Sequence, residues 1–441
     1  MTAHKKKDPS HPLESNVKSY VRSFPFMATK AKGSYIYDNE GNAHLDFLAG
    51  AGTLNYGHNN DLFKESIIQY LESDGIVHGL DMATLAKNDF IETFHQNILK
   101  PRNLDYRIQF CGPTGTNSVE AAIKLARKVT SRVNIISFTN GFHGMTSGAL
   151  AVTGNNYHKE GIPGTHSQYT TFMPYCGYSD NVDDSIAYIR QYLKDNSSGV
   201  NLPAAIILEC IQGEGGVNVA SPRWLRGIRK ICNEFNIMLI VDDIQMGCGR
   251  TGNFFSFEEA GITPDIVLLS KSIGAYGLPM AIVLFRPELD IWTPAQHNGT
   301  FRGHNLAFVA AKKAIQTYWK DSHFSKEIKE KGNIIKESLE KICKEYPEYD
   351  FELRGKGLVW ALESKQYPDL AGDIQRQCFD NGLIIETCGS TGQALKLLPA
   401  LTIAHEDLAK GLTIIEDAYQ AVIHHRQQQQ HNIVTLRTNH L

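Results

Sequence analysis

Two short apolar runs in the middle of the chain each end in residues that can do chemistry. Residues 237–241 are followed directly by Asp242 and Asp243, and residues 266–269 are followed by Ser270 and Lys271. Each run has the length and composition of a buried strand. Ligands of open α/β sheets bind in the crevice beyond the carboxyl ends of the strands, so we expect Asp242 and Lys271 to face one crevice.

A carboxylate and an amine in one crevice suit pyridoxal 5'-phosphate. The lysine bonds to the cofactor aldehyde, and the aspartate pairs with the pyridine nitrogen and keeps it protonated, which makes the ring an electron sink. A carboxylate beside a cation has a lowered pKa and therefore stays ionised. Taken alone, the pattern fits solvated strand ends equally well, because many apolar strands end in Asp or Lys.

A glycine-rich turn at 110–117, FCGPTGTN, supplies a candidate anion site. Gly115 and Thr116 lie between a predicted strand and a predicted helix, where backbone amides and small hydroxyls can hold a phosphate. It is not a Walker loop, because no Gly-Lys-Ser/Thr follows. A tight turn without a ligand has the same composition, but Asp242 and Lys271 at neighbouring strand ends favour a cofactor phosphate.

Further side chains follow the strand ends. Phe142, in TNGFHG, can stack on a flat ring or fill the core. Ile244 lies two residues past Asp242 and is placed to cover the opposite ring face, and Gln245 can donate to a phenolate oxygen. We expect them in the same crevice.

Two acids, Glu209 and Glu214, end another strand in LECIQGEGG. Acids at strand ends are usually solvated. Facing a bound anion, they would need a cation, and Lys396 or Arg302 can supply it.

The elements that position these residues alternate between strands and helices from residue 105 onward. The predicted strands cover 106–111, 134–138, 204–209, 237–241, 266–269 and 281–285, and the predicted helices between them cover 117–130 and 223–235. This alternation predicts an α/β fold with a mostly parallel, doubly wound sheet.

The two ends of the chain have a different pattern. A hairpin is predicted at 34–47, with helices at 61–73 and 84–99. After residue 300 we expect helices at 305–319, 323–346, 369–380 and 406–426 and strands at 351–355, 358–363, 383–386 and 394–398. The expected division is a disordered tail at 1–16, a small domain at 17–60 and 321–426, a large cofactor-binding domain at 61–320, and a mobile Gln-rich tail at 427–441.

Composition limits the function classes. The 441 residues exceed the usual size of a single domain, and the net charge of −3 gives no reason to invoke nucleic acid or an anionic membrane. The basic residues at 4–7 are not followed by an apolar region, so we expect neither a signal peptide nor a membrane span. Eight scattered Cys without a C-x-x-C pair predict reduced thiols, a cytoplasmic location and no metal site.

Together the motifs resemble class III pyridoxal phosphate-dependent aminotransferases. The resemblance covers essentially residues 16–425, and is carried by VDDIQMGCGRTG followed by PDIVLLSKS, with GPTGTNSVEAAIKLAR, TNGFHG, LECIQGEGGV and HNGTFRGHN at matching spacings. It implies a fold-type I transferase: a large domain with the parallel sheet, a small α+β domain built from both chain ends, and a homodimer that shares its active sites.

The resemblance also implies residue roles. Lys271 would form the Schiff base and shuttle the proton. The implied cofactor-binding residues are Asp242 at the pyridine nitrogen, Gln245 at the ring oxygen, Ile244, Phe142 and His143 around the ring, Gly115 and Thr116 at the phosphate, and Thr300 at the partner subunit's phosphate.

The implied substrate residues are Glu214 and Lys396, an acid–base pair around the glutamate carboxylate. Many class members have Arg at the Lys396 position, and many have Arg where this chain has Met145. Arg302 is the candidate replacement for that missing cation, and a surface or intersubunit salt bridge is the alternative for it.

Longer matches, such as SFPFMATKAKGSYIYDNEGNAHLDFLAGAGTLNYGHNN and HGLDMATLAK, narrow the reaction. They resemble the subgroup that moves an amino group from L-glutamate to L-aspartate 4-semialdehyde, which gives L-2,4-diaminobutyrate and 2-oxoglutarate for ectoine biosynthesis. One alternative is another ω-amino-acid transaminase, of the 4-aminobutyrate or ornithine type. The other is a binding or regulatory protein that no longer catalyses, against which Lys271 and Asp242 both argue.

Overall fold

The computed structural model describes residues 9–162, 169–178 and 182–438. Its centre is a seven-stranded sheet with the strand order β4-β12-β11-β10-β7-β5-β6. The strands are β4 (Arg107–Phe110), β5 (Ile135–Phe138), β6 (Thr170–Met173), β7 (Ala205–Leu208), β10 (Met238–Asp242), β11 (Ile266–Leu269) and β12 (Ile282–Phe285). Of these seven strands, only β12 runs opposite to the other six, so the predicted mostly parallel sheet is confirmed.

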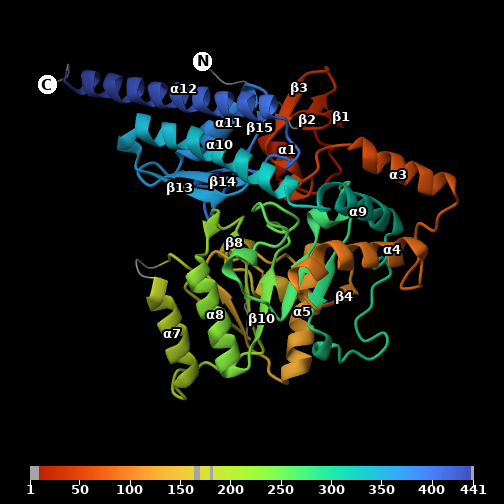
Figure 1. The fold of residues 1–441 in the computed structure, drawn as a ribbon. Helices are drawn as coiled ribbons and strands as arrows, with labels where there is room; N and C mark the ends of the chain where they lie inside the picture. Colours follow the sequence, from red (N-terminus) through yellow and green to blue (C-terminus); the bar gives the residue numbers. More distant parts are fainter. Residues whose placement is uncertain (1–8, 163–168, 179–181, 439–441) are drawn as a thin grey trace.

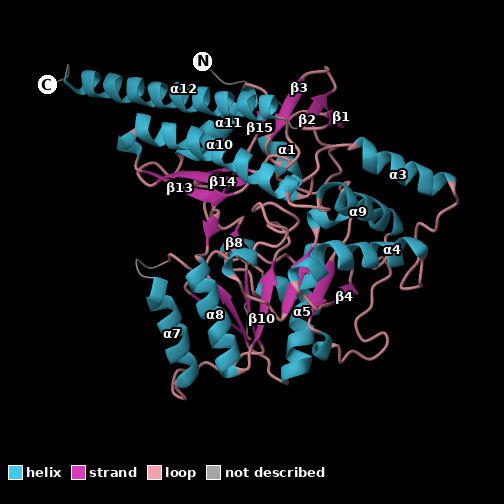
Figure 2. Cartoon of the chain, in the orientation of Figure 1, coloured by secondary structure: helices cyan, strands magenta, loops and turns pink. Residues whose placement is uncertain are grey.

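Helices cover both faces of this sheet. Successive residues of a strand point to opposite faces, and apolar residues on both faces are buried against helices. On one face, Ile240 and Leu268 pack with α5 (Gly115–Thr130). On the other face, Leu239 and Val241 pack in the core that includes α8 (Pro222–Phe235), α4 (Leu85–Phe94) and α9 (Asn305–Tyr318). Figure 2 shows the helices flanking the central strands.

The two ends of the chain build one smaller α+β part. One sheet has the order β1-β2-β3-β15 and the other β13-β14-β17-β16. These strands are β1 (Ala28–Lys32), β2 (Tyr35–Asp38), β3 (Ala43–Asp46), β13 (Phe351–Lys356), β14 (Val359–Ser364), β15 (Leu383–Ile384), β16 (Glu386–Cys388) and β17 (Ala394–Leu397). The parallel pairing of β3 with β15 joins the ends, and Figure 1 shows the red and blue segments side by side.

The remaining long helices surround these sheets. They are α3 (Asp61–Glu72), α7 (Val182–Lys194), α10 (His323–Glu345), α11 (Leu370–Asp380) and α12 (His405–Thr438). Short elements are α1 (Tyr20–Ser23), α2 (Ala49–Gly52), α6 (Ser147–Ala151), β8 (Ile211–Gln212) and β9 (Asn218–Val219). No helix in the described ranges has an apolar run that is long enough to cross a bilayer.

Several predicted boundaries differ from the structure. The final helix was expected to end near residue 426, but α12 continues to Thr438 through the Gln-rich segment. Gln and Arg are good helix formers, and Gln429 donates to His425 one turn earlier, so this composition supports a helix. The single strand expected at 383–386 is divided between β15 and β16, which belong to different sheets. Residues 1–8 of the expected N-terminal tail and residues 439–441 of the C-terminal one lie outside the described residues.

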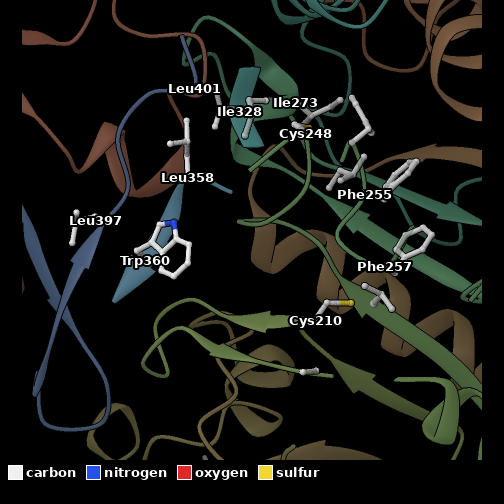
Figure 3. Packing of buried hydrophobic residues seen from close by; sticks show 14 of the residues in the cluster. Cys210, Cys248, Phe255, Phe257, Ile273, Ile328, Leu358, Trp360, Leu397 and Leu401 are labelled. Carbon is white, nitrogen blue, oxygen red and sulfur yellow. The ribbon is translucent and has the colours of Figure 1, made fainter. Parts of the chain in front are cut away.

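A shared core joins the large part to the small part. Figure 3 shows Leu358 and Trp360, from the small part, in the same apolar cluster as Cys248 and Phe255 of the large part. The fully buried Arg250 donates to the carbonyl of Leu358 at 3.0 Å. Apolar packing and this hydrogen bond therefore connect the two parts.

Candidate active site

A cavity of about 190 Å³ lies beyond the carboxyl ends of β7 and β10. It is lined by Gly115, Thr116, Phe142, His143, Gly144, Glu209, Glu214, Asp242, Ile244, Gln245 and Lys271. The structure therefore brings together every predicted cofactor residue except Thr300, from segments that are more than 150 residues apart in sequence.

Asp242 ends β10 and is held from two sides. Its Oδ2 atom lies 2.7 Å from Nδ1 of His143, and its Oδ1 atom accepts the amide of Ile244 at 3.2 Å. Burial lowers the pKa of His143, but the hydrogen bond and the charge of Asp242 outweigh burial, and the net pKa is raised. A protonated His143 fixes the orientation of the Asp242 carboxylate toward the cavity.

Glu209 directly follows β7, beside this pair. Its carboxyl accepts the amides of Phe142 at 3.0 Å and Gly213 at 3.3 Å. Burial raises the pKa of Glu209 to about 8, and the nearby His143 opposes that rise. A protonated Glu209 carries no charge at neutral pH, so it does not compete with Asp242 for a cation.

Lys271 begins the 3₁₀ turn Lys271–Gly274, which is separated from β11 by Ser270 alone. Its backbone has φ of 50°, a left-handed conformation that non-glycine residues rarely adopt and that is often found at functional sites. Burial lowers the pKa of the Lys271 ammonium, while the nearby Glu214 opposes this shift. A lowered pKa increases the fraction of free amine, which is the form that can act as a nucleophile or a base.

The predicted anion site lies at the first turn of α5, a 16-residue helix. Thr116 Oγ1 lies 2.6 Å from Oγ1 of Thr146, so two hydroxyls meet there. A Cβ atom at Gly115 would stand 3.0 Å from Ile244 Cδ1. Glycine therefore lets the helix start and Ile244 share one wall of the cavity.

Glu214 and Lys396 form the expected acid–base pair, with 2.9 Å between Oε1 and Nζ. Gln245 donates to the same Glu214 oxygen at 2.9 Å and to the carbonyl of Ala51 at 3.0 Å. Burial alone would raise the pKa of Glu214, but Lys396 and Lys271 lower it to about 2. Lys396 has no exposed side-chain surface and also lies 2.9 Å from Glu386.

Thr300 and Arg302 lie outside the cavity of their own chain. The carbonyl of Thr300 is 3.0 Å from Nε2 of His78, and Arg302 pairs with Asp81 and donates to the carbonyl of His297 at 3.2 Å. For Arg302 we considered two roles, binding of a substrate carboxylate and a salt bridge. In the single chain it forms a salt bridge with Asp81. Within one chain, neither Thr300 nor Arg302 lines the two cavities around Lys271.

A second, larger cavity of about 590 Å³ adjoins the first and shares Phe142, Glu214 and Lys271 with it. Its walls also include Tyr20, Met145 and Glu386. Met145, at the position where many class members have Arg, lines this second cavity. Sequence reasoning did not single out Tyr20 or Glu386, since neither stands in a motif.

Comparison with known proteins identifies the family. The family model "Aminotransferase class-III" matches residues 17–419. The chain belongs to the class III aminotransferases. As a member of this class it is a pyridoxal phosphate-dependent aminotransferase.

Curated relatives are similar over nearly the whole chain. A protein of Bordetella parapertussis named diaminobutyrate–2-oxoglutarate transaminase is 54% identical over 92% of this chain and 93% of its own length. One of the same name from Halalkalibacterium halodurans is 54% identical over 93% of this chain and 96% of its own length.

Solved structures share the fold. An ornithine aminotransferase of Toxoplasma gondii superposes with a TM-score of 0.80 at 26% identity, over 91% of this chain and 92% of that chain. An S-selective transaminase of Arthrobacter sp. superposes with a TM-score of 0.82 at 21% identity, over 93% and 96% of the two chains. These likenesses agree with the predicted fold-type I architecture.

The cavity residues of this aminotransferase fit its cofactor. The Asp242 carboxylate suits a protonated ring nitrogen, Phe142 and Ile244 offer apolar surface for the ring, and the α5 N-terminus suits a phosphate. Lys271, whose amine would bond to the cofactor aldehyde, lines the same cavity.

Proposed function

We propose that the protein transfers the amino group of L-glutamate to L-aspartate 4-semialdehyde, forming L-2,4-diaminobutyrate and 2-oxoglutarate. The observation that carries the proposal is the 54% identity, over more than nine tenths of both chains, to proteins named diaminobutyrate–2-oxoglutarate transaminase. The adjoining cavity supports it, because Met145 stands where a 4-aminobutyrate- or ornithine-type enzyme was expected to carry Arg.

The cofactor, when bound, supplies an electron sink for the carbanion that forms when a proton leaves the substrate carbon. Lys271 would accept that proton and return it to the cofactor carbon C4′, since burial lowers the pKa of its ammonium toward the range of a general base. The Asp242 carboxylate would pair with the ring nitrogen of the bound cofactor, and His143, 2.7 Å from that carboxylate, would keep it in position.

Glu214 and Lys396 bind the dicarboxylic substrate. While they are paired, the Lys396 charge is neutralised. We propose that Glu214 turns away when glutamate or 2-oxoglutarate enters, and that Lys396 then meets the substrate carboxylate. Because Lys is a point charge without the planar fork of Arg, this contact is a single charge-assisted hydrogen bond rather than a bidentate one.

We further propose a homodimer in which Thr300 completes the phosphate site of the partner subunit. The support is an exposed apolar surface around the Thr300 loop, made of Ile76, Val77, Leu80, Met82, Leu85 and Phe301. Leu85 is 84% exposed and Phe301 63% exposed, which is unusual for large apolar side chains unless another surface covers them. The same face carries Arg302, whose cation is proposed to serve the shared substrate pocket.

Mixed dimers test this arrangement. Lys271→Ala and Thr300→Val would each impair the protein alone, but a dimer of one subunit of each type keeps one intact site. Refolding the two variants together should restore up to about a quarter of the wild-type activity, because half of the randomly paired dimers are mixed and each has one of two sites. Activity no higher than that of the separate variants would contradict the shared site.

We propose a cytoplasmic location and a role at the start of ectoine biosynthesis. The location is supported by eight cysteines that are all unpaired in the structure, as is usual in a reducing compartment. The pathway is supported by the longer sequence matches noted above.

The deciding experiment is a substrate comparison with the purified holoenzyme. Glutamate-dependent amination should be measured with aspartate semialdehyde and with succinate semialdehyde as acceptors, and the product identified by mass spectrometry. A higher kcat/KM for aspartate semialdehyde is expected. Preference for succinate semialdehyde would instead indicate a 4-aminobutyrate-type enzyme.

A further inference from the structure

The larger cavity beside Lys271 has an acidic wall that the mechanism above does not fully use. Two carboxylates, Glu214 and Glu386, line it together with Lys271. The charge of Glu214 is neutralised by Lys396, and the same carboxylate oxygen accepts a hydrogen bond from Gln245. Glu386 has no motif-based role, yet its side chain is 7% exposed and faces the space in which a substrate must lie.

The position of Glu386 is set by the small sheet. Strands β16 and β17 are antiparallel, and Glu386 stands directly opposite Lys396. Directly opposed side chains lie on the same face of a sheet, which explains the 2.9 Å distance between Glu386 Oε1 and Lys396 Nζ. Tyr20, from α1, lines the same cavity as Glu386, and the Glu386 carboxylate contributes to the raised pKa of the Tyr20 hydroxyl, after burial.

The charges of this cluster do not balance. Lys396 lies 2.9 Å from Glu386 and 2.9 Å from Glu214, so one ammonium serves two carboxylates. Burial raises the pKa of Glu386, whereas the pKa of Glu214 is lowered to about 2. Of the two carboxylates, Glu386 is therefore the one whose ionised form needs a further cation. Lys271 loses its positive charge in its free-amine form, so it does not meet that need.

We propose that Glu386 is a specificity residue that binds a second ammonium group of the amine substrate, the one that does not react. In the proposed reaction this is the α-ammonium of diaminobutyrate and of aspartate semialdehyde, so the inference rests on the proposed function. Lys396 stays paired with Glu214 while such a substrate is bound, and Glu386 and the Tyr20 hydroxyl face the ammonium.

This assignment gives one pocket two modes. Glutamate has no second ammonium once its own amine reacts, and its remaining charged groups are two carboxylates, one of which Lys396 can meet. Diaminobutyrate presents an ammonium near the same place, which Glu386 can meet. A monoamine such as 4-aminobutyrate also presents a carboxylate to Lys396, but once its terminal amine reacts it has no second ammonium for Glu386. A site built to bind a polar group rejects analogues that lack it, since the site's own charged group is then left unpaired.

The test compares substrates that differ only in the second ammonium. The wild-type holoenzyme should have a higher kcat/KM for diaminobutyrate than for 4-aminobutyrate, with 2-oxoglutarate as acceptor. Glu386→Gln should reduce this ratio about 10- to 100-fold, as expected for the loss of one charge-assisted hydrogen bond. Glu386→Asp keeps the charge and should retain more of the preference than Glu386→Gln.

The matched control is Glu352→Gln. Glu352 lies on β13 in the same sheet and pairs with Arg354 and Lys365, but it is not part of either cavity wall. This variant should leave the substrate ratio unchanged. A second readout is the dissociation constant of each amine, measured by calorimetry with the holoprotein that also carries Lys271→Ala, in which chemistry is blocked. Glu386→Gln should weaken binding of diaminobutyrate and leave binding of 4-aminobutyrate nearly unchanged.

Failure of the inference and failure of the proposed function give different results. If the wild type prefers ornithine to diaminobutyrate, the proposed substrate is wrong, and Glu386 is then judged by the ratio of ornithine to 5-aminopentanoate. If the wild type prefers a diamine and Glu386→Gln keeps that preference, the inference is overturned. A wild type that prefers neither diamine to its monoamine analogue also overturns it.

Discussion

Replacing Asp242 with Asn tests the feature on which the cofactor site depends. Asn has nearly the same shape and can still accept the Ile244 amide, which Asp242 accepts at 3.2 Å. It cannot carry the negative charge that pairs with His143 at 2.7 Å and would pair with a protonated ring nitrogen. The substitution therefore removes charge and keeps packing.

The magnitude follows from burial. The side chains of Asp242 and His143 are 4% and 1% exposed, so water does not replace the lost partner. Removing one member of a buried charge pair costs about 3–5 kcal/mol. If the whole cost is added to the activation barrier of the step that needs a protonated ring nitrogen, the glutamate half-reaction slows by about 10²- to 10⁴-fold. Each factor of ten corresponds to about 1.36 kcal/mol.

The assay is a single-turnover reaction of the holoenzyme with glutamate, followed by the absorbance of the bound cofactor. The control is Asp243→Asn, the next residue along the chain. Asp243 is also buried, but its Oδ2 atom accepts the Ser256 amide at 3.0 Å and it does not line the cavity. Asp243→Asn should leave the half-reaction rate unchanged. If Asp242→Asn remained within tenfold of the wild type, the role given to Asp242 would be wrong.

Three further outcomes are expected. Lys271→Ala should abolish turnover and change the visible absorbance of the bound cofactor, and retained turnover would refute its role as the base. Because burial raises the pKa of Glu209 from 4.5 to about 8, the folded protein keeps a proton there that the unfolded chain releases, and stability should fall as pH rises from about 5 to about 8. In urea unfolding of the cofactor-free protein, Glu209→Gln should flatten this fall, and an unchanged slope would contradict the assignment. Gly115→Ala should weaken cofactor binding by about 1–3 kcal/mol, measured by fluorescence titration, because the new Cβ atom would press on Ile244 from 3.0 Å.

The sequence predicted the parts of the site that depend on local pattern. Asp242 and Lys271 each follow an apolar run, and a strand-end position in a parallel sheet needs no knowledge of the rest of the fold. The predicted start of α5 was two residues late, because the helix begins at Gly115 inside the turn that was assigned to the anion site. This error moved no residue out of the cavity.

What the sequence did not predict depends on pairing between distant segments. His143 was named, but its bond to Asp242 joins residues that are 99 positions apart. Glu386 faces Lys396 only because β16 and β17 adopt one register, and a slip of one residue would turn Glu386 to the opposite face. Side-chain partners of this kind come from tertiary structure and leave no periodic signal in the chain.

The two acidic clusters of the site share one electrostatic design. Around the ring position, one cation, His143, lies beside the two carboxyls of Asp242 and Glu209, and around the substrate position, one cation, Lys396, lies beside those of Glu214 and Glu386. In each cluster, burial raises the pKa of the second carboxyl, Glu209 or Glu386. Both second carboxyls are therefore more easily ionised once a ligand cation is present. It follows that the ligand-free protein should lose stability as pH rises and that cofactor and diamine should together reduce this loss. Thermal unfolding at several pH values, with and without each ligand, measures this directly, and a pH dependence unaffected by both ligands would contradict it.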